Sequence, residues 1–143
     1  MKSLPQSCED CFKEYQAALE DLNNFAHRAD FAKLTDSQSR ELIMSFEVTH
    51  ELALKVIQKY FEKQGKGPFS GSRDATIEAF HADLIDDGKV WLDMVIDRIQ
   101  YNPVYPIDTQ GKFLENIQKR YIPALGKFEE TIDSLRIKSI PSD

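Results

Sequence analysis

Apolar side chains recur at spacings of three and four residues along most of this 143-residue chain. Such spacing places them on one face of an α-helix, whereas a strand requires alternation, which no long segment shows. We therefore expect long helices at residues 7–29, 37–64 and 109–136, and shorter ones at 73–85 and 89–101. This pattern predicts an all-α fold, an antiparallel four-helix-type bundle with two shorter helices between the second and the last long helices.

Capping residues and glycines indicate where the first two helices begin and end. Ser7, followed three residues later by Asp10, approximates a capping box at the start of the first helix. Asp36 or Ser37 is the expected cap of the second helix, because both side chains accept hydrogen bonds from free backbone N–H groups. Gly65 is its expected stop, since glycine readily adopts the left-handed conformation that ends helices.

Two of the later helices carry features that affect packing. Ser72 is the expected cap of the third helix, whose expected buried face consists of Ile77, Ala79, Phe80 and Leu84. In the last helix Pro123 lacks the backbone N–H that regular α-helical bonding requires. We therefore expect a kink near residues 119–120.

The length and composition fit one globular domain over residues 1–143. Hydrophobic residues make up 41% and charged residues 29%, which is the balance of a folded chain. We expect the packed core to span about residues 7–137, with frayed ends. No apolar run approaches the roughly 20 residues that cross a bilayer, and the first residues lack the apolar stretch of a secretion signal. A cytoplasmic protein without a membrane partner is the expectation.

The net charge of −6 bears on the class of partner. Proteins that bind nucleic acids without regard to sequence need several Lys or Arg side chains directed at phosphates. Acidic groups equal or outnumber basic ones in the first, middle and last parts of this chain. A general nucleic-acid binder is therefore disfavoured, although a local basic groove for a nucleotide or RNA is compatible with the sequence.

The cysteines and histidines indicate no metal or cofactor. Cys8 and Cys11 form a lone CxxC pair, whereas zinc needs about four ligands. We expect ordinary reduced thiols, with Cys8 or Cys11 partly packed. His50 and Glu51 begin an HExxH pattern, but Leu54 takes the place of its second histidine. His50 lies in the apolar seam of the second helix, where we expect a hydrogen-bonded core or interface histidine.

The stretch DRIQYNPVY, residues 97–105, carries the side chains best suited to binding. The Arg98 guanidinium can clamp a phosphate or carboxylate with two parallel hydrogen bonds. Alternatively, it pairs with a neighbouring aspartate as a solvated charge at a helix end. Tyr105 lies between Pro103 and Pro106, which stiffen the backbone, so we expect its hydroxyl to be exposed. Such a phenol either accepts a transferred group or packs at an interface.

A second arginine, Arg73, falls in the first turn of the expected third helix. The free backbone amides at a helix start favour anions, so Arg73 is well placed to contact a ligand there. The alternative is a structural pairing with Asp74 or Glu78. The sequence thus gives Arg98 and Arg73 as candidate substrate- or anion-binding residues.

Three stretches resemble the nucleotidyltransferase substrate-binding protein family, a branch of the HEPN superfamily. Residues 45–65, SFEVTHELALKVIQKYFEKQG, resemble its FE-T-ELAWK helix, with Leu54 in place of a tryptophan. Residues 72–98 match a pattern in which Arg73, a glycine, a tryptophan and a methionine fall in register. Residues 98–105 occupy the place of the family's RNxxSHxY motif. Together the resemblance covers most of residues 9–137.

This resemblance implies a bundle that forms a homodimer, with the arginine–histidine motif near the dimer interface. It also implies a minimal nucleotidyltransferase as partner and a nucleotide or RNA as ligand. Some relatives are toxins that cleave RNA. The tyrosine of their motif is modified with adenylyl groups by the partner, which then acts as an antitoxin. Tyr105 stands at the position of that tyrosine, so the resemblance makes it a candidate modification site.

The chain departs from this motif at its histidine, which is replaced by Pro103. Cleavage of RNA through its 2′-hydroxyl needs a general base with a pKa near 7, which histidine supplies and proline lacks. Pro103 is therefore a degenerate motif position, and we predict no catalytic residue. The predicted function is a non-catalytic partner or substrate-binding subunit of a minimal nucleotidyltransferase.

Two alternatives stay open at the level of sequence. One is a HEPN-type ribonuclease toxin in which Tyr101, Tyr105 or a histidine brought in by folding replaces the missing base, and whose motif tyrosine the partner modifies. The other is a plain dimeric adaptor without nucleotide chemistry. A basic nitrogen placed beside the Arg98 guanidinium in the cleft between two subunits would overturn the prediction of a non-catalytic subunit.

Overall fold

The computed structural model describes residues 6–139, and all regular structure within this range is helical. The expected all-α fold is confirmed. α1 begins at Gln6, so Ser7 lies inside its first turn and not at the cap position. The elements in chain order are α1 (Gln6–Arg28), the 3₁₀ turn η1 (Phe31–Lys33), α2 (Asp36–Glu62), α3 (Ser72–His81), α4 (Gly88–Gln100), the 3₁₀ turn η2 (Ile107–Gln110), α5 (Gly111–Asn116), the π-helical turn η3 (Ile117–Tyr121) and α6 (Ile122–Ser139).

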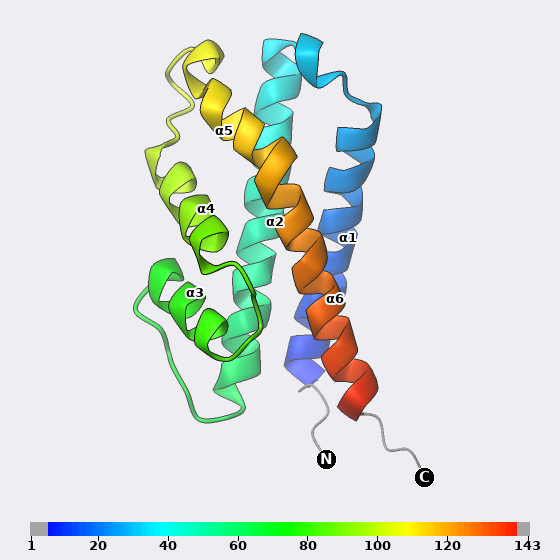
Figure 1. Ribbon diagram of the computed structural model, residues 1–143, viewed down its shortest axis with the longest axis vertical. Helices are drawn as coiled ribbons and strands as arrows, with labels where there is room; N and C mark the ends of the chain where they lie inside the picture. The colour runs from blue at the N-terminus through cyan, green and yellow to red at the C-terminus, as the bar shows by residue number, and fades with distance from the viewer. Residues whose placement is uncertain (1–5, 140–143) are drawn as a thin grey trace.

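The long helices pack as an antiparallel bundle (Figure 1). α1 and α2 run in opposite directions and share the most extensive helix–helix contact. The continuous rod formed by α5, η3 and α6 packs across them, and the shorter α3 and α4 lie along one side of the bundle. α4 contacts η3, and side-chain bonds tie its last turn to the middle of α2. This arrangement decides where the candidate site lies.

The start of α2 is fixed by a residue that the sequence analysis did not select. Thr35, and not Asp36 or Ser37, occupies the cap position. Its hydroxyl accepts a hydrogen bond from the Gln38 backbone N–H, and the Gln38 side chain accepts one from the Thr35 N–H. This is a complete capping box. The helix ends at Glu62, and Gly65 follows in the left-handed region with φ of 76°, as expected for a stop.

Aromatic rings form much of the core between the helices. Phe46, Trp91, Tyr121 and Phe128 are almost fully buried. The ring centroids of Trp91 and Phe128 lie 5.3 Å apart in an edge-on arrangement, and those of Phe46 and Tyr121 lie 5.2 Å apart in a stack. Both distances fall in the range that favours aromatic pairs. The core therefore joins α2, α4, η3 and α6.

Around residues 119–120, where a kink is expected from the sequence, the helix contains a π-helical turn. In η3 the N–H of Ile122 donates to the carbonyl oxygen of Ile117, five residues earlier, instead of four. Pro123 has no N–H, so the α-helical hydrogen bond that residue 123 would donate is missing whatever the type of turn before it. The wider turn lets the chain continue as α6 without a break.

The buried face of the rod continues past the π turn at ordinary α-helical spacing. Its almost fully buried residues are Tyr121, Leu125, Phe128 and Ile132, which follow one another at intervals of four and three residues. The apolar pattern of the sequence is also compatible with Ala124 and Thr131 on this face, but both are partly exposed.

α3 is shorter than expected and presents a different face to the core. It ends at His81, four residues before the expected end. Ser72 is its first residue and not its cap; the cap position is Gly71, whose lack of a side chain leaves the helix start without a side-chain hydrogen bond.

The expected buried face of α3 is confirmed at Ala79 and Leu84 and wrong at Ile77 and Phe80, which are 37% and 44% exposed. The buried side chains within the helix are the small ones of Ala75, Thr76 and Ala79. Small residues let α3 lie close to α2, which turns its large apolar residues outward. Within the described residues, no helix is both long enough and apolar enough to cross a bilayer.

Candidate functional site

The loop after α4 is held by an arginine from α2. Arg40 donates from Nη1 to the carbonyl oxygen of Pro103 at 2.9 Å and from Nη2 to that of Tyr105 at 3.3 Å. The loop also bonds to itself, because the side chain and the carbonyl of Asn102 accept from the N–H groups of Val104 and Tyr105. The backbone of the loop is therefore fixed although the loop lies at the surface.

The fixed loop presents two exposed side chains. Val104 is 84% exposed and Tyr105 is 57% exposed. Among the described residues, no hydrogen-bond partner is found for the Tyr105 hydroxyl. The expected exposure of this phenol is confirmed, whereas its modification is not tested by the structure.

The second part of the site is the Arg98 guanidinium, in the last turn of α4. Its Nη1 lies 3.0 Å from Nδ1 of His50, and its Nη2 lies 3.4 Å from a carboxylate oxygen of Glu51. Both partners belong to the middle of α2. The Arg98 side chain is 25% exposed and that of Glu51 is 65% exposed, so the carboxylate contact is open to water while the imidazole contact is not.

His50 is fully buried, which confirms the expectation of a hydrogen-bonded core histidine. Its ring stacks almost parallel to Phe46, with centroids 5.7 Å apart, and lies 6.0 Å from the Trp91 ring. Burial first, and the Arg98 charge second, lower the pKa of His50 to about 3. The imidazole is therefore neutral at physiological pH.

Two buried nitrogens at this junction have no hydrogen-bond partner among the described residues. They are Nε of Arg98 and Nε2 of His50. A buried donor without an acceptor typically costs about 1–3 kcal/mol, and native structures contain few of them. The Arg98–His50 junction thus carries more donors than the protein supplies with acceptors.

Two acidic side chains modify the charge of this junction. Glu51 contacts Arg98 directly. Partial burial raises the pKa of Glu47, and the Arg98 charge partly opposes that rise. Glu51 is solvent-exposed, and an exposed ion pair is worth only about 0–1 kcal/mol. A phosphate-sized anion can therefore displace Glu51 from the guanidinium at little cost.

These residues lie on one surface, which we name the α2–α4 face. Positions 40, 44, 48 and 51 recur at helical spacing on α2, so they share one side of that helix. The face combines Arg98 with large apolar side chains that are exposed to solvent. Its members are Arg40, Met44, Glu47, Val48, Glu51, Arg98, Ile99, Val104 and Tyr105.

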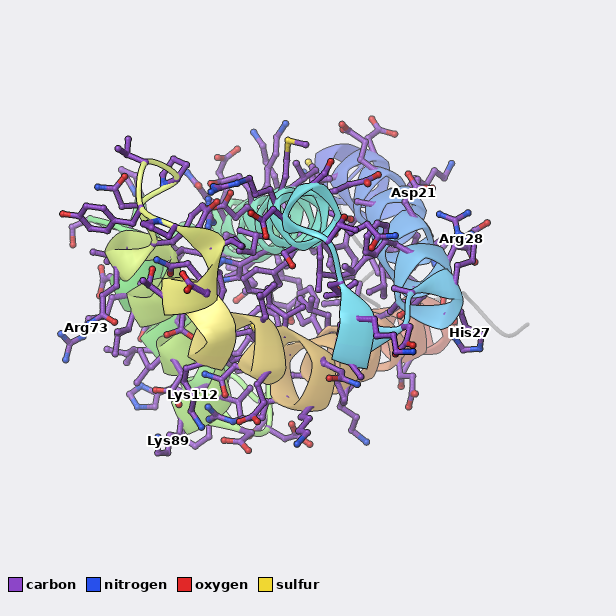
Figure 2. All side chains as sticks on the ribbon, turned by 90° about the horizontal axis from the view of Figure 1, so that it is seen from above. Asp21, His27, Arg28, Arg73, Lys89 and Lys112 are labelled. Carbon is purple, nitrogen blue, oxygen red and sulfur yellow. The ribbon has the colours of Figure 1, made fainter. Side chains whose placement is uncertain are left out.

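Arg73 does not join this junction. It lies near the start of α3 and its side chain projects outward from the body of the protein (Figure 2). Among the described residues it forms no hydrogen bond or salt bridge, and none links it to Arg98. The pairing of Arg73 with Asp74 or Glu78 is therefore not observed; Asp74 instead accepts from the hydroxyl of Ser70.

A second polar cluster lies on the side of α4 that faces η3. Asp97 accepts hydrogen bonds from the hydroxyl of Tyr121 and from the side-chain amide of Asn116. Asp93 accepts from Arg120 at 2.6 Å and from Lys89 at 3.0 Å. The bond from Arg120 is the main reason why the pKa of Asp93 lies below its ordinary value. We name it the rear cluster; it fixes α4 against η3.

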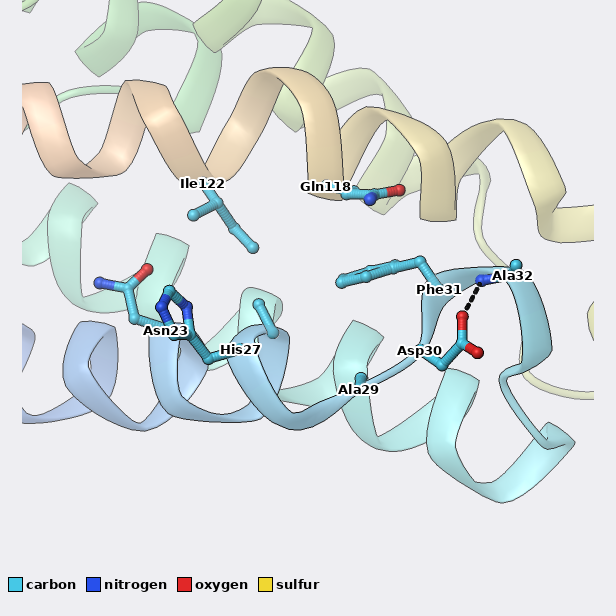
Figure 3. A pocket seen from close by; sticks show the side chains of 9 residues that line it. Asn23, His27, Ala29, Asp30, Phe31, Ala32, Gln118 and Ile122 are labelled. Atoms are coloured by element: carbon cyan, nitrogen blue, oxygen red, sulfur yellow. Dashed lines mark hydrogen bonds between the residues drawn. The ribbon is translucent and has the colours of Figure 1, made fainter.

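A pocket of mixed polar and apolar lining lies elsewhere, at the end of α1. It has a volume of about 590 Å³ and is bordered by Asn23, His27 and Phe31 on one side and by Gln118 and Ile122 on the other (Figure 3). None of the residues selected from the sequence lines it. Asp30, at its edge, accepts from the Ala32 N–H and so serves the local turn.

The described residues contain no group of His, Cys, Asp and Glu side chains arranged to hold a metal ion. Cys8 and Cys11 are both free and buried. Burial, followed by the proximity of Cys11 and Glu9, raises the pKa of Cys8 to about 12. A thiol with such a pKa is unreactive at neutral pH, which matches the expectation of ordinary packed thiols.

The site residues missed by sequence reasoning are Arg40, Glu47 and the partnership of Arg98 with His50. Arg40 acts on a loop more than 60 residues away, and no local pattern signals that contact. For His50 a signal did exist: a histidine in an apolar seam needs a polar partner. The sequence did not say that this partner is Arg98.

The helices that carry Arg98, His50 and Arg73 all lie within a single family match. A model described as nucleotidyltransferase substrate binding protein like matches residues 10–134. No curated protein matches the chain. Since the family model covers most of its length, the chain belongs to the nucleotidyltransferase substrate binding protein like family.

Proposed function

We propose that this chain is a non-catalytic helical subunit that binds a minimal nucleotidyltransferase together with the nucleotide or RNA on which that enzyme acts. Family membership supports the nucleotidyltransferase partner and a substrate-binding role. The observation that carries the anion-binding role is the donor excess at Arg98. Its protein partners are one imidazole nitrogen and one exposed carboxylate, so each Nη atom keeps an N–H group without an acceptor among the described residues, on a side chain that is 25% exposed.

In this proposal three side chains have separate roles. Arg98 is the main contact for a phosphate oxygen, since a guanidinium offers several N–H groups in a fixed plane. Arg73, which is exposed and has no salt-bridge partner among the described residues, contacts a more distant part of the ligand. Tyr105 presents its phenol at the surface, either to the partner or as an acceptor of a nucleotidyl group.

The absence of catalysis is proposed from the chemistry beside Arg98. A basic nitrogen, Nδ1 of His50, does lie 3.0 Å from the guanidinium, an arrangement that would overturn a non-catalytic role if this nitrogen were open to a cleft between two subunits. The ring is fully buried and its lone pair already accepts from Arg98. A base must reach the proton that it removes. His50 does not reach solvent, and Pro103 has no titratable group.

We also propose that the chain forms a homodimer in the cytoplasm and uses the α2–α4 face as its interface. Met44, Val48, Ile99 and Val104 are large apolar side chains that are more than half exposed on this face. Clusters of this kind are typical of protein–protein contacts. A dimer formed there would enclose Arg98 and reduce its exposure to water.

One observation favours a second candidate function, a HEPN-type ribonuclease toxin of a toxin–antitoxin pair. Tyr105 is exposed and its backbone is fixed by Arg40, as a defined acceptor of a nucleotidyl group would require. In that case the partner would switch off RNA cleavage by modifying the phenol.

The two functions are separated by two measurements on the purified full chain. Size-exclusion chromatography with a minimal nucleotidyltransferase encoded in the same genomic neighbourhood tests for a stable complex. Incubation of the chain with RNA, alongside Arg98→Ala and the exposed control Arg28→Ala, tests for cleavage. We expect a complex and no cleavage. Cleavage that is lost in Arg98→Ala but kept in Arg28→Ala would replace the first proposal by the second.

A further inference from the structure

The hydrogen bond between Arg98 and His50 can have only one direction. A guanidinium has N–H donors and no acceptor, so the ring nitrogen at 3.0 Å must be the acceptor. Nδ1 of His50 therefore carries the lone pair, and the ring proton is on Nε2. This assignment follows from chemistry and geometry together, since ring protons are inferred from their partners.

The acceptor nitrogen is fixed in space because the imidazole cannot move. The ring is fully buried, stacks on Phe46 at 5.7 Å and is bordered by Trp91 at 6.0 Å. His50 also belongs to the middle of α2, far from either end of the helix. A rotation of this ring would have to displace core aromatic side chains, which are packed without room to spare.

The other partner of the guanidinium is mobile by comparison. Glu51 contacts Nη2 at 3.4 Å and is 65% exposed, so water competes for this bond. Arg98 is thus held firmly at Nη1 and loosely at Nη2. An anion that replaces Glu51 finds the guanidinium plane already oriented.

We propose that His50 is a positioning residue, which accepts a hydrogen bond from Arg98 and thereby orients the guanidinium toward a phosphate-type oxyanion on the α2–α4 face. The inference rests on the proposed anion-binding function of Arg98 and adds to it a residue that never touches the ligand. Orientation before binding increases affinity, because a side chain already ordered loses less entropy when the ligand arrives.

Three variants test this role by isothermal titration with inorganic phosphate and with AMP. His50→Asn places a short amide oxygen near the position of Nδ1, whereas His50→Leu fills the space without an acceptor. Arg98→Ala removes the anion contact, and the exposed His27→Asn serves as a matched control. We expect His50→Leu to lose about tenfold in affinity. His50→Asn should stay within about threefold of wild type and His27→Asn should equal it.

A merely structural role for His50 would give a different result. It would make His50→Leu bind as tightly as wild type, while Arg98→Ala loses binding; this outcome overturns the inference and leaves the proposed function intact. If wild type binds neither phosphate nor AMP, both the positioning role of His50 and the proposed anion-binding function of Arg98 are overturned. Should His50→Leu fail to fold, the ¹⁵N spectrum of the wild-type imidazole decides. A neutral ring protonated on Nε2 supports the inference, and any other form contradicts it.

Discussion

Two polar clusters border α4, and they differ in how completely their hydrogen bonds are satisfied. In the rear cluster, on the side of α4 that faces η3, Asp97 accepts hydrogen bonds from two side chains and Asp93 from two more, including Arg120 at 2.6 Å. In the front cluster, where α4 meets α2, the Arg98 guanidinium donates to one imidazole nitrogen and one exposed carboxylate. Two buried nitrogens of the front cluster lack any partner among the described residues.

A satisfied buried network makes a structure rigid, whereas a partly satisfied one is costly and is expected to have another purpose. The rear cluster fixes α4 against η3. We propose that the front cluster instead serves a ligand, because it supports the Arg98 guanidinium and leaves N–H groups on its Nη atoms for an anion.

The largest expected effect is on stability and concerns the rear cluster. Asp97→Ala removes the acceptor of the Tyr121 hydroxyl, which belongs to a fully buried residue, and of the Asn116 amide. We expect the free energy of unfolding, measured in urea, to fall by about 2–3 kcal/mol. Arg98→Ala leaves only one buried acceptor unpaired and should cost about 1 kcal/mol. Equal costs for the two substitutions would contradict the contrast.

The next effect is a pH dependence caused by the buried imidazole. His50 ionises at about 6.5 in the unfolded chain but only near pH 3 in the folded one. Between these values the unfolded state binds more protons, so stability falls as pH falls below about 6.5. We expect a loss of about 2 kcal/mol between pH 7.5 and pH 5.

The matched variant for this pH dependence is His50→Asn. In this variant the fall of the free energy of unfolding with falling pH should largely disappear. Glu47, whose pKa is raised by partial burial, remains in both proteins and cancels in the comparison. Urea unfolding at five pH values measures the slope. Parallel curves for wild type and variant would show that His50 is not a buried neutral ring.

A smaller effect concerns the loop that Arg40 holds. Arg40→Ala removes the donors to the carbonyl oxygens of Pro103 and Tyr105. We expect backbone amide exchange at residues 102–105 to accelerate about tenfold, with a stability loss of about 1 kcal/mol or less. Mass spectrometry measures the exchange rate of these amides, with Arg28→Ala as the control. Unchanged exchange would mean that the prolines alone fix the loop.

The smallest expected effect on stability comes from Glu51, the mobile partner of Arg98. Glu51→Gln removes an exposed ion pair and should change the free energy of unfolding by no more than about 0.5 kcal/mol. The same substitution should raise phosphate affinity about two- to fivefold, because the anion no longer competes with a carboxylate. Glu62→Gln, at the far end of α2, is the control. A fall in affinity would show that Glu51 helps to hold the guanidinium.

Helical periodicity sufficed to predict the main elements of this fold. Apolar spacing located every helix of the bundle, and the missing N–H of Pro123 located the irregularity that appears as η3. The end of α3 and its buried face were not predictable in the same way. Ile77 and Phe80 are exposed because the small residues of α3 pack on α2. Which face of α3 is buried thus depends on how closely the two helices approach, and the sequence of α3 alone does not give that distance.

The candidate site was predictable only where a single residue carries the chemistry. Arg98 and Tyr105 stand out in the sequence because they fall at the arginine and tyrosine positions of the RNxxSHxY motif that this stretch resembles. The residues that hold them, His50 and Arg40, lie more than 45 positions away in sequence. Such contacts are created by the antiparallel packing of the helices, and a local pattern carries no trace of them.

The central claim is that the protein satisfies Arg120 and leaves Arg98 with donors for an anion. The most direct test is the side-chain ¹H–¹⁵N spectrum of both arginines during a titration with inorganic phosphate at constant ionic strength. We predict that the Nε–H signal of Arg98 shifts and saturates while that of Arg120 stays in place. A stationary Arg98 signal, or equal shifts at both arginines, would contradict the account.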